Sequence, residues 1–81
     1  MSYTPQNLAA LQVLMLFSSP TGLEGIKVHK SAAPELIAAA ASLHEAGFIT
    51  QVDGGYLTQL GIETAEHAHS LFYLLNSSAD A

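Results

Sequence analysis

The side chains of this chain that suit a metal ion are four histidines and seven acidic residues. Residues three or four apart on a helix lie on one face, and Glu63 with His67 and Glu66 with His69 have these spacings. His67 and His69 are two residues apart, which places them on different faces, whereas the ligands of a metal site converge on one point. The spacing therefore favours ordinary pairs on a helix surface, and we expect no metal site.

The serines and histidines give no sign of catalysis. None has the spacing of a nucleophile with its base, and no signature of an enzyme family is visible. Residues 22–27 superficially resemble a phosphate-binding loop, but they lack its glycine spacing and the Ser or Thr that follows its lysine. A chain of 81 residues also leaves little room for a ligand cavity once its core is filled. We therefore expect no enzymatic activity and no cofactor.

Basic residues are scarce. Lys27 and Lys30 stand against seven acidic residues, arginine is absent, and the formal net charge is −5 with neutral histidines. A nucleic-acid-binding surface takes most of its affinity from lysines and arginines that neutralise phosphates. Two such contacts predict a weak electrostatic attraction to DNA.

Because basic residues are so few, the candidate DNA-binding residues can be named individually. If DNA is bound, we expect Lys27 and Lys30 at phosphates, with His29 and His44 assisting and Ser42 within reach of base edges. The alternative is that the two lysines and His29 form a solvated strand face, because lysines at strand ends commonly protect an exposed sheet edge.

The elements that must position these residues follow from local signals. Thr4 and Pro5 predict the start of a first helix that runs to about Phe17, where a run of turn-forming residues over 18–22 ends it. Residues 26–29 alternate apolar and polar side chains, which is typical of a short strand with one buried face.

A second helix and a hairpin come next. Pro34 suits the first turn of a helix over residues 34–46, and Gly47 suits its end. Residues 48–52 and 56–58 look like strands on either side of Asp-Gly-Gly at 53–55, and Asp-Gly is a strong signal for a tight hairpin turn.

Thr58 predicts the start of a third helix that reaches about Leu75. One apolar stripe runs along it, formed by Ile62, Ala65, His69, Phe72 and Leu75. We expect residues 1–76 to form a single domain and residues 77–81 a flexible tail. The order helix, short strand, helix, β-hairpin, helix predicts a small α+β domain that is winged-helix-like. Residues 34–46 would take the place of the recognition helix and residues 48–58 that of the wing.

The first and third helices carry more apolar residues than one interface needs, which predicts a homodimer. The residues expected at its interface are Leu11, Met15, Leu71, Phe72 and Leu75. The alternative is that the two helices cover each other within one protomer. A further surface for a partner helix is the run of small residues over 38–41.

The expected location is the cytoplasm, without membrane contact. There is no cysteine, which fits a reducing compartment. The apolar stretch over residues 8–17 is too short to span a bilayer and follows no basic residue, so it does not fit a signal peptide.

Five segments carry a resemblance to known proteins: residues 24–29, 48–51, 53–58, 60–61 and 65–68. In them the chain resembles a family of short bacterial proteins, of about 80 residues, carried as conserved hypotheticals and sometimes labelled DNA-binding. The resemblance implies a winged-helix fold and a regulatory role. We thus expect a regulatory or DNA-binding winged-helix protein of unknown target. The alternative is a protein-interaction or dimerisation module that does not bind nucleic acid.

Overall fold

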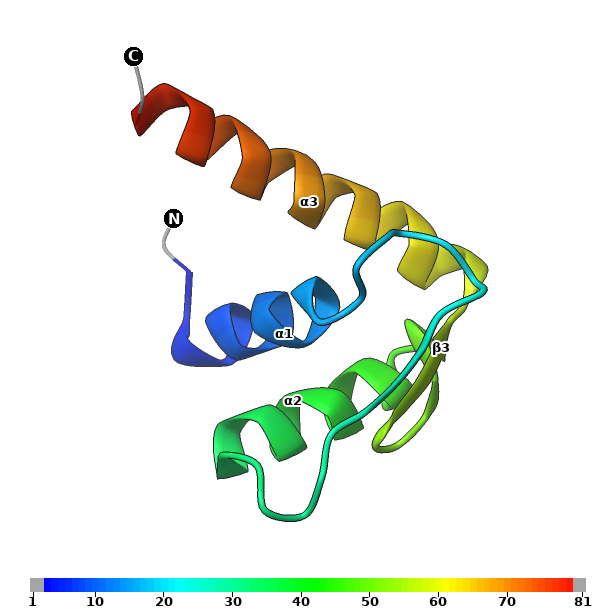
Figure 1. Cartoon of the computed structure of the whole chain (residues 1–81). Coiled ribbons are helices and arrows are strands. Elements are labelled where there is room, and N and C mark those ends of the chain that lie inside the picture. Colours follow the sequence, from blue (N-terminus) through cyan, green and yellow to red (C-terminus); the bar gives the residue numbers. More distant parts are fainter. Residues whose placement is uncertain (1–2, 80–81) are drawn as a thin grey trace.

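The computed structural model describes residues 3–79, which form three helices and one antiparallel sheet (Figure 1). The strands lie in the order β1-β3-β2. This arrangement confirms the predicted α+β domain and its order of elements, and it is compatible with a winged-helix-like fold. The elements are α1 (Pro5–Met15), β1 (Gly25–Lys27), α2 (Pro34–Glu45), β2 (Ile49–Gln51), β3 (Gly54–Leu57) and α3 (Gln59–Ala79).

The predicted helix starts are confirmed by their caps. The Thr4 hydroxyl accepts the amide of Asn7, and the Asn7 side chain accepts the amide of Thr4, both at 3.0 Å. This reciprocal pair satisfies two amides that the first helical turn leaves without partners. At the start of α3, the Thr58 hydroxyl accepts the amide of Gly61 at 3.1 Å.

The core lies between α1, α2, the sheet and the first half of α3. Its largest fully buried side chains are Phe17, Ile49 and Val13. Small buried residues such as Ala40 and Ala65 let the helices approach closely around them. The centre of the core is therefore formed by α1, by Phe17 two residues past its end, and by Ile49 of β2.

The hairpin differs from its prediction in the position of the turn. The turn is made by Val52 and Asp53, whereas Gly54 and Gly55 belong to β3 and pair with β1. Both glycines have positive φ, 132° and 74°, and a β-carbon on Gly54 would meet the backbone of Ile26. Gly54 is therefore needed because β1 lies against it, and Gly55 because a β-carbon there would meet the side chains of Thr50 and Gln51 in β2.

Three element ends also differ. Helix α1 ends at Met15 and not at Phe17, because the last amides turn to carbonyls three residues back, which tightens the final turn. Strand β1 covers Gly25–Lys27 and does not reach His29. Helix α3 continues past Leu75 to Ala79. The flexibility expected for 77–81 stays a prediction, and residues 80–81 lie outside the described residues.

Glu24 holds the loop after α1 together, and His69 joins that region to α3. The Ser18 amide and hydroxyl donate to the two carboxylate oxygens of Glu24 at 2.6 and 3.0 Å, and the Ser19 amide donates at 3.3 Å. His69 of α3 lies nearby, with Nε2 2.9 Å from the carbonyl oxygen of Phe17. These contacts fix the path of the chain between α1 and β1.

Desolvation at this half-buried position raises the pKa of Glu24. The hydrogen bonds from Ser18 and Ser19, together with the nearby His69, lower the pKa by more. The pKa of Glu24 therefore lies below its ordinary value of 4.5. A lowered pKa in the folded state means that the ionised carboxylate stabilises the fold. That contribution is fully present above the unfolded-state pKa and is lost as pH falls through the lower folded-state pKa.

We predict that Glu24→Gln lowers the thermal unfolding midpoint at neutral pH and that its difference from the wild type shrinks as pH falls below about 4.5. Thermal melts of both proteins across this range test it. Glu45→Gln, which removes an exposed carboxylate at the end of α2, is the control and should follow the wild-type profile. Parallel profiles for wild type and Glu24→Gln would contradict the prediction.

Gly61 holds α3 close to the hairpin. It is buried in the first turn of α3, and a β-carbon there would overlap the carbonyl oxygen of Phe48. That oxygen accepts the amide of Thr58 at 3.1 Å, so it cannot move away without loss of this bond. A side chain at position 61 would therefore push α3 away from the sheet.

Gly61→Ala is expected to destabilise the fold by about 1–3 kcal/mol, the usual cost of overpacking, although alanine alone favours a helix by roughly 1 kcal/mol. Urea unfolding measures the change. The matched control is Gly22→Ala, because a β-carbon at Gly22 meets its nearest atom, in Ile62, at an ordinary 3.5 Å. A Gly61→Ala protein as stable as the wild type would show that α3 does not rest on the hairpin.

Candidate functional site

Both lysines of the chain line one depression of about 700 Å³, which lies between the β1–α2 loop, α2 and the hairpin turn. We call it the lysine depression. Its lining consists of Lys27, Val28, His29, Lys30, Ser31, Ile37, Ala40, Ala41, Val52 and Asp53.

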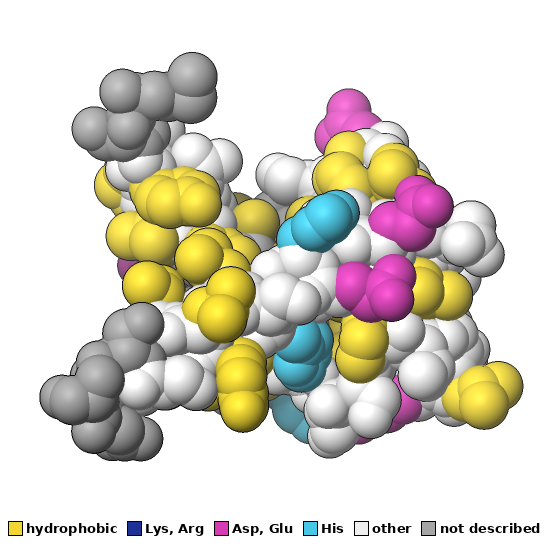
Figure 2. All heavy atoms as spheres, turned by 90° about the horizontal axis from the view of Figure 1, so that it is seen from above, with side chains coloured by type: hydrophobic (Ala, Val, Ile, Leu, Met, Phe, Trp, Pro, Cys, Tyr) yellow, Lys and Arg dark blue, Asp and Glu magenta, His cyan; other side chains and the backbone are white. Residues whose placement is uncertain are grey.

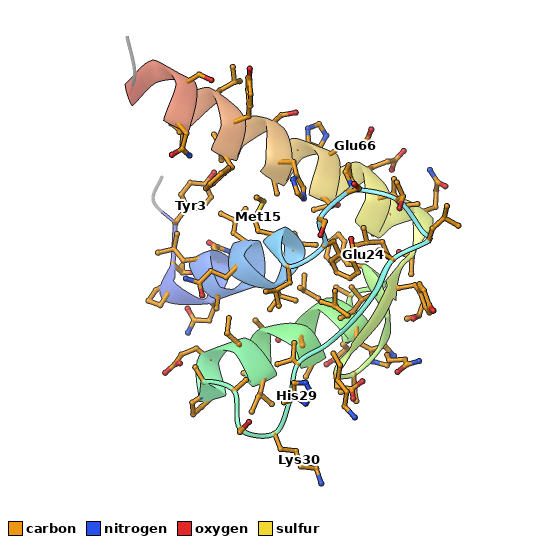
Figure 3. All side chains as sticks on the ribbon, viewed as in Figure 1. Tyr3, Met15, Glu24, His29, Lys30 and Glu66 are labelled. Carbon is orange, nitrogen blue, oxygen red and sulfur yellow. The ribbon has the colours of Figure 1, made fainter. Side chains whose placement is uncertain are left out.

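The cationic rim comes from one short stretch of chain. Lys27 is the last residue of β1, an edge strand, and it is paired with Gly54. His29 and Lys30 are exposed in the loop that leads to α2, and Figure 3 shows Lys30 pointing away from the body of the protein. The loop is held by a turn in which the amide of Ala32 donates to the carbonyl of His29 at 2.9 Å.

The walls of the depression are apolar and come from two other segments. Ile37 and Ala41 lie on one face of α2, and Val52 comes from the hairpin turn. The turn is fixed beside the loop because the amide of Val28 donates to the carbonyl of Asp53 at 2.7 Å. The carboxylate of Asp53 places one negative charge next to the two positive ones. The depression can thus attract an anion only through a small net positive charge.

Of the predicted DNA-contacting residues, the structure brings Lys27, His29 and Lys30 together. Ser42 lies apart, since it lines a different groove on the other side of α2. His44 is exposed and follows Ile37 by seven residues, which places it on the helix face that lines the lysine depression, two turns further on. Binding by these residues stays a prediction.

The groove that contains Ser42 has a volume of about 550 Å³ and runs between α1 and α2. Its lining includes Ala9 and Ala10 from α1, and Ala38 from α2. Of the run of small residues over 38–41, Ala38 and Ala39 line this groove, whereas Ala40 and Ala41 line the lysine depression. The small side chains of the groove leave room where larger residues would fill the space between the helices.

Sequence reasoning missed the walls of the lysine depression. Ser31, Ile37 and Val52 come from a loop, a helix and a turn, and no local pattern links them. The sequence holds no signal that marks them, because their exposure, 39% for Ile37 and 59% for Val52, is seen only in the structure.

Three of the acidic residues lie away from the lysines. Figure 2 shows acidic and histidine side chains on the face above α3, and no lysine is visible in that view. Glu63 and Glu66 are exposed on α3, and Glu24 is engaged by the loop after α1. Two others, Glu35 and Glu45, are on α2, and Asp53 lines the lysine depression itself, so the lysines are only partly separated from negative charge.

Residues 3–79 contain neither a metal-binding cluster nor a membrane-spanning helix. No cluster of three or more His, Cys, Asp or Glu side chains in this range could hold a metal ion. None of the helices described is both long enough and apolar enough to cross a membrane.

Comparison with known proteins gives a family and no assigned activity. Neither the curated proteins nor the solved structures yield a match. A protein family matches residues 1–76, and its description is "Family of unknown function (DUF5669)". The expectation of a family of short proteins without a known activity is confirmed, whereas this description mentions neither a winged helix nor DNA. Because the match covers nearly all of its 81 residues, the chain belongs to this family of unknown function, DUF5669.

Proposed function

We propose that the protein is a small regulatory module of winged-helix type that contacts DNA through the lysine depression. One observation carries the proposal: both lysines, with His29, line a depression between α2 and the hairpin turn. In helix-turn-helix proteins the second helix enters the major groove, and α2 occupies the corresponding place in this order of elements.

The charge of the chain limits the affinity. A net charge of −5 opposes DNA overall, so attraction depends on the two lysines that lie together at one depression, away from the acidic residues of α3. Two phosphate contacts give a slope of about −1.8 in log affinity against log salt, since each contributes about −0.9. Affinity should then fall roughly tenfold between 50 and 200 mM salt.

The exposed side chains of α2 limit specificity. Donors that read base edges are few on this helix, and Ser42 lies on the side away from the lysines. His44 remains as a donor on the face that lines the lysine depression. The proposed contact is therefore mostly to phosphates, with little direct reading of sequence.

We predict that replacing both Lys27 and Lys30 by alanine abolishes DNA binding, because it removes both phosphate contacts. Fluorescence anisotropy with a pool of mixed duplex fragments, at low and at physiological ionic strength, measures this. Unchanged affinity in the double variant, or no binding by the wild type at low salt, would refute the proposed function.

Two single substitutions provide a matched control for net charge. Asp53→Asn and Glu63→Gln each remove one negative charge, but only Asp53 lines the lysine depression. Asp53→Asn is expected to tighten binding several-fold, whereas Glu63→Gln on α3 should change it little. Equal effects of the two would mean that net charge, and not the depression, governs attraction.

The second candidate function is a protein-interaction module that does not bind nucleic acid. It is favoured by the groove between α1 and α2, whose described lining is mostly small or apolar, with Glu35 as its one charged residue, and suits the apolar face of a partner helix. Absence of DNA binding at low salt, together with a protein partner that stays bound after nuclease treatment, would support this candidate.

A further inference from the structure

Helix α3 extends beyond the core that its first half covers. It has 21 residues and is therefore about 31 Å long. Gly61, Ala65 and Ala68 are buried along one face. Phe72 and Leu75 continue this row at the same alternating spacing of four and three residues, yet they are 56% and 63% exposed. The face that packs on the core thus continues without cover.

Other apolar side chains surround this free end. We call the whole set the terminal apolar surface, and it consists of Tyr3, Leu8, Leu71, Phe72, Tyr73, Leu74 and Leu75. Figure 2 shows hydrophobic side chains gathered at the end of the molecule where both termini lie. In Figure 3, Tyr3 and Met15 lie on the side of α1 that faces α3.

We infer that the terminal apolar surface binds a second copy of this chain in a two-fold homodimer. The inference is independent of the proposed contact with DNA. Alternating spacings of three and four residues are those of a helix-pairing seam. In the first half of α3 this seam is filled by the chain's own core, and in the second half α3 and α1 of the second copy would fill it.

The available area fits a stable dimer. A fully buried aromatic side chain removes about 150–250 Å² from water, so Tyr3, Phe72 and Tyr73, each more than half exposed, offer on the order of 400 Å², and the four leucines add to this area. A standard interface buries about 800 Å² on each partner. The apolar residues occupy more than one side of α3, so a single partner helix would not cover them. A second copy supplies two helices, α1 and α3.

Charge also favours a second copy. Two chains with a net charge of −5 repel each other unless they meet through an uncharged surface. Residues 70–77 of α3 contain no Asp, Glu, Lys, Arg or His, whereas Glu63, Glu66 and His67 lie in the other half of the helix. The uncharged end of the molecule is therefore where like-charged copies can meet.

A lipid surface fits less well. Helices that lie in a membrane interface usually carry lysine or arginine on their polar face, and α3 has neither. The acidic chain would also be repelled by anionic lipids.

The residues expected at the interface differ in how much surface they expose. Leu11 and Met15 are half-buried and pack against the core, so they have less surface to offer. Phe72 and Leu75 are the central contacts, and Leu8 extends the surface onto α1 at 51% exposure. Phe72 and Leu75 are therefore the residues to change in a test.

The test is the molar mass of the full chain by light scattering and sedimentation equilibrium over a wide range of concentrations. We expect the wild type to have twice the chain mass of 8.5 kDa at high concentration and to dissociate on dilution. Phe72→Glu with Leu75→Glu should remain at the chain mass. Phe72→Ala with Leu75→Ala should raise the dimer Kd on the order of a hundredfold or more, since each change occurs twice in a two-fold interface.

Controls separate loss of the interface from loss of the fold. Leu23→Glu places the same charge at an apolar loop residue that is 89% exposed, and it should leave the dimer intact. Circular dichroism of the alanine variant should match that of the wild type. A wild type that stays monomeric at all concentrations would overturn the inference, as would a dimer that persists in the glutamate variant. A monomer that co-sediments with phosphatidylcholine vesicles would instead assign the surface to lipid.

Discussion

The placement of α3 depends on the hydrogen bonds of one threonine. The Thr58 hydroxyl donates to the carbonyl of Gly47 after α2 and accepts the amide of Gly61 in α3. The Thr58 amide donates to the carbonyl of Phe48 at the start of the hairpin. One residue therefore joins the end of α2, the hairpin and the start of α3. Since Gly61 rests directly on Phe48, the first turn of α3 has little freedom to tilt.

This junction positions both the terminal apolar surface and the lysine depression. It directs α3 so that Ala65 and Ala68 close the core, while Phe72 and Leu75 pass beyond it. The hairpin that it holds is also paired with β1, through the glycines at the start of β3. That pairing brings the hairpin turn beside the β1–α2 loop and so forms the lysine depression.

Local signals in the sequence predict this fold well where a residue acts on its own neighbours. The caps at Thr4 and Thr58 are of this kind, and both are confirmed. Asp-Gly predicts the hairpin but not its turn, because Gly54 is required by β1, which is distant in sequence, and Gly55 by the side chains of β2. The clustering of Lys27 with Lys30 is local and was predictable. The separation of Ser42 was not, because it depends on which face of α2 meets α1.

The proposed homodimer bears on the proposed contact with DNA, because each chain has only two lysines. One chain offers two phosphate contacts, and its excess of acidic residues opposes a polyanion. A dimer in which both pairs of lysines reach one duplex would offer four, for a salt slope of about −3.6, and the second pair would act at the high effective concentration that physical linkage provides. Self-association through the proposed surface would leave the lysines free, since neither is part of the terminal apolar surface. Dimerisation would also double the net negative charge, so it would raise the affinity for DNA only where the added phosphate contacts outweigh that repulsion.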